Sequence, residues 1–416
     1  MHRVVVNLST RYAQKQKYYH EKNNPICDID VIINNHFGQS KDEYLKKVLN
    51  NLEKVESATY NSRREGWAPA DTAASIIMNH FVKEYNNPQD STIGASFVNF
   101  LQKDTTHMTF CYDGKMKAYV YVEDKEIVID SFKIKRALFR PLTPPFFNYT
   151  KSIIKYALET KDSISIKMEE KKDVIYFCLT IFKDQQVEFF GKAYYLENPS
   201  DFGESTSKYE IWIDKSTDFP FKVRREMSHD ISVETVSNVS LNKIKNSKFK
   251  AADYFQPDYK LVVHSTQNQN RKENKWIGKK APDWILVDTN NKVQSLNGLK
   301  SKVIMIQFTS VSCGPCKASI PFLNKLTSAY NKKDFDFVAI ECSANSLRAL
   351  QFYQNKNAIN YKFLKSTKVV LKDYGIGGFP VFFILDENRV IRNATSGYGE
   401  ITTDKKIKDA IDELLK

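Results

Sequence analysis

The chain lacks any apolar run of the ~18 residues that a membrane-spanning helix needs. It also lacks a secretory signal, because the apolar stretch from Val4 to Val6 is far shorter than the hydrophobic region of such a signal. Either the chain is cytosolic, or a leader peptide was removed or never included. At 416 residues the chain is too long for one hydrophobic core, so two or three domains are expected.

Basic runs and nucleic-acid motifs are also missing. The net charge of +13 would permit binding to nucleic acid. The lysines, however, are interspersed with acidic residues, as between Lys167 and Asp173. Such mixed charge is typical of a solvated surface, so no nucleic-acid partner is predicted.

Cysteine is scarce, with six residues, and one close pair stands out. Cys313 and Cys316 are separated by Gly314 and Pro315. Half of a zinc site is one interpretation of this pair. A structural zinc site needs four ligands, however, and the sequence has no second Cys-x-x-Cys and no close pair of histidines. We therefore predict no metal site.

The other four cysteines are widely separated, and nothing in the sequence fixes their pairing. They are Cys27, Cys111, Cys178 and Cys342. Cys111 and Cys178 lie in strand-like stretches and are predicted to be small buried apolar residues. Cys342 is either a core cysteine or a regulatory thiol, and the frequent burial of cysteine favours the core.

The cysteine pair lies between a predicted strand and a predicted helix. Residues 303–308 are a short run of branched and aromatic side chains, which indicates a buried strand. Residues 317–326 carry apolar side chains at helical spacing. Cys313 should therefore lie at a helix N-terminus, where unpaired N–H groups and the helix dipole favour a thiolate. A Cys-x-x-Cys in this setting indicates redox chemistry.

The elements around the pair alternate between strand and helix. We predict strands at 335–340 and 381–385, a helix at 346–354, a hairpin at 385–391 and a closing helix at 403–415, which together indicate a mainly parallel sheet. In motif, spacing and element order, residues 276–416 resemble the thioredoxin superfamily, and most closely its TlpA/ResA-like branch. Residues 278–302 are similar to the N-terminal hairpin that this branch adds.

The resemblance implies a role for each residue of the motif. Cys313 matches the exposed nucleophile, and Cys316 matches the buried cysteine that resolves the mixed disulfide. Pro380 matches the cis-proline that faces the disulfide. The backbone of Phe379 is then expected to pair with an extended substrate segment. Gly314 and Pro315 complete the expected substrate surface, and no cofactor beyond the cysteine pair is needed.

The sequence departs from the family pattern near the cysteines. Ser312 stands where the branch usually has tryptophan. Gln307 and Ser319 stand where relatives place a buried acid, and neither side chain can relay a proton. Glu341 is the nearest carboxylate at a predicted strand end, and we expect it to be an ordinary solvated residue.

Residues 1–262 show a different pattern, in which strands predominate over helices. Residues 1–38 are predicted to be an extension, and helices are predicted at 42–55, 72–85 and 146–158. Short alternating segments predict a curved antiparallel sheet with helices on one face, an α+β arrangement. The strands are predicted at 108–112, 115–122, 126–130, 163–168, 174–182, 186–190, 209–213, 221–225 and 231–235.

Two segments of this sheet, 112–121 and 209–225, resemble the LolA/LppX-like half-barrel. The resemblance implies a concave face that holds an acyl chain or a hydrophobic partner segment. The alternative is a concave face that the helices simply fill. Residues 264–275 are polar and without periodicity, so the predicted division is an antiparallel β domain at 39–262, a linker at 263–275 and a thioredoxin-like domain at 276–416.

The sequence thus predicts a two-domain thiol-disulfide oxidoreductase that reduces extracytoplasmic proteins, in the periplasm or cell envelope. Its partners would be a disulfide-containing protein and an upstream thiol electron donor. The Gly314-Pro315 dipeptide matches reducing thioredoxins, which favours a potential of about −270 mV over about −120 mV. The alternative is a lipid- or protein-binding module whose thioredoxin-like domain mainly docks a partner.

Overall fold

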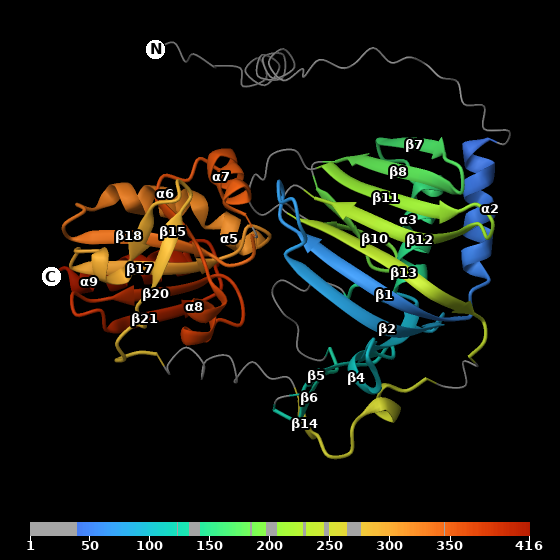
Figure 1. Ribbon diagram of the computed structural model, residues 1–416, viewed down its shortest axis with the longest axis horizontal. Coiled ribbons are helices and arrows are strands. Elements are labelled where there is room, and N and C mark those ends of the chain that lie inside the picture. Colours follow the sequence, from blue (N-terminus) through green and yellow to red (C-terminus); the bar gives the residue numbers. More distant parts are fainter. Residues whose placement is uncertain are drawn as a thin grey trace, which may run out of the picture. The chain divides into compact units, whose positions relative to one another are not determined.

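A computed structural model describes most of the chain after residue 39 (Figure 1). The predicted extension at 1–38, Cys27 and residues 264–275 of the predicted linker lie outside the described residues, so the division into two domains stays a prediction. The described residues are 40–122, 124–132, 142–183, 185–196, 206–227, 230–244, 249–263, 276–344 and 346–416.

The strands before the predicted linker form a twelve-stranded sheet. All neighbouring strands in it are antiparallel except β14 and β6, so the predicted large antiparallel sheet is confirmed. From one edge to the other, the strands are β14 (Lys260–Val263), β6 (Glu126–Asp130), β5 (Lys117–Tyr121), β4 (Asp104–Tyr112), β3 (Ala95–Leu101), β2 (Ile76–Asn86), β1 (Ser57–Trp67), β13 (Ile231–Leu241), β12 (Phe219–Glu226), β11 (Thr206–Asp214), β8 (Val174–Phe182) and β7 (Ile164–Glu170). A separate ribbon pairs β9 (Gln186–Phe189) with β10 (Ala193–Leu196).

The helix predicted at 72–85 is wrong, because this segment contributes strand β2. β2 pairs with β1 on one side and with β3 on the other, and both ladders satisfy its backbone hydrogen bonds. Pairing between distant segments thus overrides the local periodicity that suggested a helix. Besides β2, four strands before the predicted linker were not predicted, namely β1, β3, β10 and β14.

The other two predicted helices are present as α2 (Lys41–Glu53) and α3 (Phe146–Glu159). They pack against each other and against β12. Ser40 and Glu43 form a capping box at the start of α2. α3 begins after a proline without a side-chain cap, and Glu84 of β2 instead accepts hydrogen bonds from the first turn of α3.

The strands after the predicted linker form a seven-stranded sheet. Its inner strands β18 and β19 run parallel to β17, whereas β20 runs antiparallel to β17. In order, the strands are β16 (Val293–Ser295), β15 (Ile285–Asp288), β19 (Lys362–Lys365), β18 (Phe335–Glu341), β17 (Val303–Thr309), β20 (Val381–Leu385) and β21 (Ile391–Ser396). The helices are α5 (Gly314–Ala318), α6 (Ile320–Ala329), α7 (Leu347–Lys356), α8 (Lys368–Asp373) and α9 (Thr402–Leu414).

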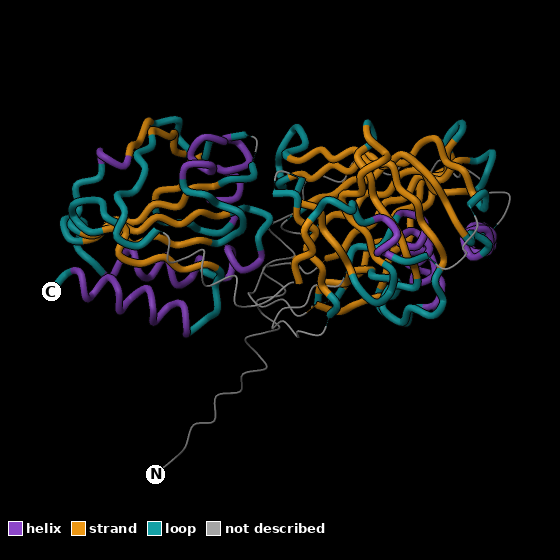
Figure 2. Tube along the Cα trace, turned by 90° about the horizontal axis from the view of Figure 1, so that it is seen from below, coloured by secondary structure: helices purple, strands orange, loops and turns teal. Residues whose placement is uncertain are grey.

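Helices lie on both sides of this sheet (Figure 2). All seven residues of β17 are buried. Met305 packs in a cluster with residues of α6, α7 and α9, and Ile306 packs on the opposite face with residues of α8. The predicted strands and helices of this half are confirmed, whereas β19 and α8 were not predicted. No helix among the described residues is both long and apolar enough to cross a membrane.

Candidate redox-active site

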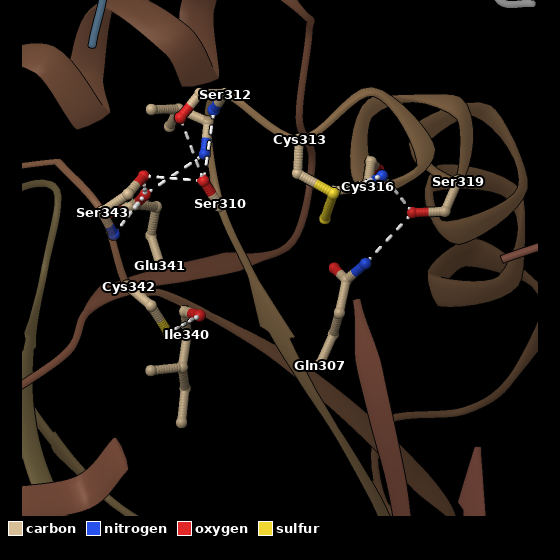
Figure 3. The surroundings of a disulfide bond; sticks show 11 residues. Gln307, Ser310, Ser312, Cys313, Cys316, Ser319, Ile340, Glu341, Cys342 and Ser343 are labelled. Carbon is tan, nitrogen blue, oxygen red and sulfur yellow. Dashed lines mark hydrogen bonds between the residues drawn. A yellow bond between two sulfur atoms is a disulfide. The ribbon is translucent and has the colours of Figure 1, made fainter. Parts of the chain in front are cut away.

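The two cysteines of the Cys-x-x-Cys lie at the end of β17, as predicted. Cys313 is the N-cap of α5, and its sulfur accepts a hydrogen bond from the backbone N–H of Cys316 at 3.2 Å. A disulfide joins the two residues, whose Cα atoms are 5.2 Å apart (Figure 3). Cys313 is half-buried, whereas Cys316 is 1% exposed. An attacking group from solvent therefore reaches Cys313 first.

Gly314 and Pro315 form the first turn of α5 and are half-buried. Proline is tolerated there because the N–H it lacks has no partner within a helix. The peptide bond between Phe379 and Pro380 is cis, as the family resemblance implied. Because β17 pairs with β20, Pro380 lies at the same end of the sheet as the cysteine pair.

The backbone of Phe379 is available for pairing. Among the described residues, no hydrogen bond uses its N–H or C=O. Phe379 itself is half-buried, and Pro380 is buried. An extended peptide could add to this edge by backbone hydrogen bonds, which is a common way to bind a segment without fixing its sequence.

Two neutral polar side chains lie beneath Cys316. The Gln307 amide nitrogen donates to the Ser319 hydroxyl at 3.1 Å, and this hydroxyl donates to the Cys316 carbonyl at 2.6 Å (Figure 3). Gln307 is 1% exposed and Ser319 is fully buried. Neither side chain accepts a proton near neutral pH, so this contact to the resolving cysteine provides no general base.

The prediction that Glu341 is an ordinary solvated residue is wrong, because this residue is 1% exposed at the end of β18. It accepts hydrogen bonds from the backbone N–H groups of Val311 at 3.2 Å, Ser343 at 2.8 Å and Ala344 at 2.8 Å. Burial raises the pKa of the Glu341 carboxyl, while these donors and the Ser343 hydroxyl oppose the rise. Glu341 thus joins the loop before Cys313 to the loop after β18.

Three hydroxyl groups extend this connection. The Ser310 hydroxyl lies 2.8 Å from that of Ser343 and 3.2 Å from that of Ser312 (Figure 3). Sequence reasoning missed this cluster, because its members come from two loops about thirty residues apart in the chain. A charged residue directly after an apolar strand was the available signal.

The remaining described cysteines do not belong to the redox pair. Cys111 and Cys178 are buried in β4 and β8, as predicted, and burial raises the pKa of the Cys111 thiol to about 12. Cys342 is half-buried, and its thiol donates to the Ile340 carbonyl at 3.2 Å. Burial also raises the pKa of Cys342, which keeps it a thiol and makes it a poor nucleophile. The described residues contain no cluster of three or more metal-ligating side chains.

Comparison with known proteins identifies relatives of the last third of the chain. The Redoxin family model matches residues 277–411. Thiol-disulfide oxidoreductase ResA of Bacillus thuringiensis (strain Al Hakam) is 26% identical over 118 residues, which are 28% of this chain and 68% of the relative. Thioredoxin-like protein YneN of Bacillus subtilis (strain 168) is 27% identical over 139 residues, which are 32% of this chain and 78% of the relative.

Solved structures align with the same third of the chain. A thiol:disulfide interchange protein of Chlorobium tepidum TLS is 21% identical with a TM-score of 0.31, covering 33% of this chain and 97% of its own. The thiol:disulfide interchange protein of a Bacteroides species is 19% identical with a TM-score of 0.30, covering 33% and 90%. The family match and the curated relatives agree with the strand-to-helix cysteine pair described above. Residues 277–411 are therefore a thioredoxin-superfamily segment of the TlpA/ResA-like type.

Proposed function

We propose that the protein is a thiol-disulfide oxidoreductase that reduces disulfides in extracytoplasmic proteins. The observation that carries this proposal is the disulfide between half-buried Cys313, at a helix N-terminus, and buried Cys316. Unequal exposure gives the two sulfurs different roles, because a substrate meets one of them and the other stays protected. The helix N-terminus stabilises the Cys313 thiolate.

The reaction has two exchange steps. In the reduced protein, the Cys313 thiolate attacks one sulfur of the substrate disulfide, so a mixed disulfide forms and the first substrate thiolate leaves. Cys316 then loses its proton and attacks the Cys313 sulfur. The bond to the substrate breaks, the second substrate thiolate leaves, and the Cys313–Cys316 disulfide forms. Two electrons have passed to the substrate, and an upstream thiol donor returns two electrons to the pair.

The surroundings of the pair support a polypeptide substrate. The backbone of Phe379 takes an extended segment, and Pro380, Gly314 and Pro315 complete the contact surface around Cys313. A location in the periplasm or cell envelope follows from the TlpA/ResA-like resemblance and is part of the proposal. Titration against glutathione tests the reducing direction, for which we expect a potential of about −270 mV.

Insulin reduction tests the reaction. The Cys313→Ser variant should lose all activity, because the attacking sulfur is gone. The Cys316→Ser variant should form a mixed disulfide with insulin that persists, and mass spectrometry of the adducts that it forms in a cell extract would identify its protein substrate. A Cys313→Ser variant that keeps the main activity would instead favour a binding module.

A cavity between the twelve-stranded sheet, α3 and β9 favours ligand binding as a second candidate function. Its volume is about 310 Å³, and Met78, Tyr149, Phe189 and Val223 contribute to its walls. Arg225 and Glu188 also line it and form a buried ion pair. We propose that this cavity takes a hydrophobic or acyl ligand with a polar group near the ion pair.

Binding of a fluorescent fatty acid to the whole protein tests this second function. The Met78→Trp variant, which narrows the cavity, should weaken probe binding, whereas Cys313→Ser should not change it. No probe binding to the wild type would favour a concave face that the helices fill, and equal binding in the Met78→Trp variant would show that the probe binds outside this cavity.

A further inference from the structure

Two rows of residues form one wall of the cavity between the twelve-stranded sheet, α3 and β9. The rows cross four neighbouring strands, β2, β1, β13 and β12 (Figure 1). One row contains Met78, Arg64, Glu234 and Val223, and the next contains Ile76, Gly66, Ser232 and Arg225. All of them line the cavity. Because side chains alternate along a strand, both rows lie on the same face of the sheet. Gly66 and Ser232 have little or no side chain, so they leave space beside the two arginines.

Arg225 shows how a guanidinium in this cavity can be satisfied. Its Nε donates to one carboxylate oxygen of Glu188 at 2.7 Å, and its Nη2 donates to the other oxygen. Its Nη1 donates to Asp230 at 2.8 Å. Each nitrogen of this guanidinium thus has a carboxylate partner, as expected for a buried charge.

Arg64 is satisfied less completely. Its Nε lies 3.0 Å from Glu234, whose carboxylate also accepts a hydrogen bond from the Ser62 hydroxyl at 2.6 Å. Among the described residues, no hydrogen bond uses either Nη atom of Arg64. The Arg64 side chain is only 24% exposed. Two donor nitrogens of a mostly buried guanidinium therefore remain available in the cavity.

These donors suit an oxyanion. The parallel N–H groups of a guanidinium bind a carboxylate or a phosphate as a fork. The described acids of the lining are already engaged, Glu188 and Asp230 with Arg225, Glu234 with Ser62 and Arg64, and Glu65 with Arg63. Arg225 binds two carboxylates at once, so a guanidinium of this cavity tolerates a second anion beside the first. An oxyanion from outside the chain would give Arg64 the second partner that Asp230 gives Arg225.

We propose that Arg64 binds the oxyanion, a carboxylate or a phosphate, of an amphiphile whose apolar chain lies against Met78 and Val223. This inference rests on the proposed ligand binding, and it names the polar group of the ligand and the residue that binds it. Met78 and Val223 lie in the same cross-strand row as Arg64, so one ligand can contact the apolar and the charged side chains together. A free anion would leave the apolar wall unused.

Isothermal titration calorimetry of the whole protein with decanoate and with decanol at pH 8 tests this inference. The two compounds have the same chain length, and only decanoate carries an oxyanion. The wild type should bind decanoate about tenfold more tightly than decanol, because a hydrogen-bonded charge pair forms. Arg64→Gln should weaken decanoate binding about tenfold or more and leave decanol binding unchanged. Arg64→Lys keeps a cation beside Glu234 but cannot form the fork, so it should weaken decanoate binding about fivefold even if Arg64→Gln fails to fold.

Arg63→Gln is the matched control. Arg63 precedes Arg64 in β1, so its side chain points to the opposite face of the sheet. It pairs with Glu65 and is 49% exposed. Its substitution removes the same charge and should change neither affinity.

Several outcomes would overturn the inference. They are equal affinities of the wild type for decanoate and decanol, equal losses for both compounds in Arg64→Lys, and the same loss in Arg63→Gln. Displacement of decanoate by an equal concentration of inorganic phosphate would also overturn it, because the site would then take a free anion. A wild-type protein that binds neither decanoate nor decanol would refute the proposed ligand binding itself.

Discussion

Replacing Gln307 by glutamate should accelerate the second exchange step. Glutamate has the size and shape of glutamine, so its carboxylate would lie where the amide now donates to Ser319, beneath Cys316. In the wild type this position is neutral, so Cys316 must lose its proton in a buried setting without a general base at position 307. The substitution supplies the missing base without changing the volume of the side chain.

The pKa of Glu84 indicates how far burial would raise the pKa of the new carboxyl. Burial raises the pKa of Glu84 from 4.5 to about 7, although two backbone N–H groups and the Tyr60 hydroxyl donate to it. At position 307 the neighbouring Ser319 hydroxyl already donates to the Cys316 carbonyl, so the new carboxylate would have fewer donors than Glu84 and its pKa should be raised at least as far. A carboxyl that titrates near neutral pH is an effective general base, and such a base contributes about 10²- to 10⁴-fold. We expect resolution to become about 10²-fold faster at pH 8.

Rapid-quench, single-turnover reduction of a peptide disulfide measures this step as the decay of the mixed disulfide. The acceleration should be complete above the pKa of the new carboxyl and should vanish as the pH falls toward 5, because the acid form cannot accept a proton. Gln307→Met is the control, since it keeps the volume but has no base. A decay rate that is unchanged at pH 8, or an equal acceleration in Gln307→Met, would refute this account of Gln307.

Three further predictions concern other groups. Iodoacetamide should modify Cys313 before Cys316 in the reduced protein, because Cys316 is 1% exposed, and equal labelling by mass spectrometry would contradict the assigned roles. Glu84→Gln should flatten the pH dependence of stability. In the wild type the raised pKa of Glu84 stabilises the fold below pH 4.5, and this stabilisation is lost as the pH rises through about 7. The loss should be about 3 kcal/mol in the free energy of unfolding, measured with urea. A parallel pH dependence in both proteins would show that Glu84 does not titrate in this range. Glu341→Ala should destabilise the protein by about 3 kcal/mol, because buried N–H groups of two loops lose their acceptor, and a loss below about 1 kcal/mol would mean that water replaces the carboxylate.

The sequence was most informative where the relevant contacts are local. The strand before Cys313, the helix after it and the different exposure of the two cysteines follow from residues within about twenty positions. The predicted strands 108–112 and 115–122 are separated only by Asp113 and Gly114, and they pair as neighbours, β4 and β5. In these segments the hydrophobic periodicity and the turn residues themselves determine the local structure.

The predictions failed where contacts between distant segments of the chain determine the structure. β1 is mostly polar and carries no alternation that would mark a strand, yet it pairs with β2 and with β13, which lies far later in the chain. The burial of Glu341 likewise depends on Val311, thirty residues earlier in the chain. A buried carboxylate can be foreseen only if its donors are known, and those donors are brought together by the parallel pairing of β17 and β18.

The two outer strands of the twelve-stranded sheet differ in how they resist self-association. β7 is seven residues long, and Lys167, Glu169 and Glu170 give this edge charges that oppose docking of another strand. β14 is four residues long and has little charge beyond Lys260, and its Leu261 and Val263 are 54% and 68% exposed. Protection at that edge comes from shortness, since four residues offer few backbone groups as a template. At high protein concentration, edge-to-edge aggregation should therefore begin at β14, and a lysine in place of Val263 should raise the solubility limit.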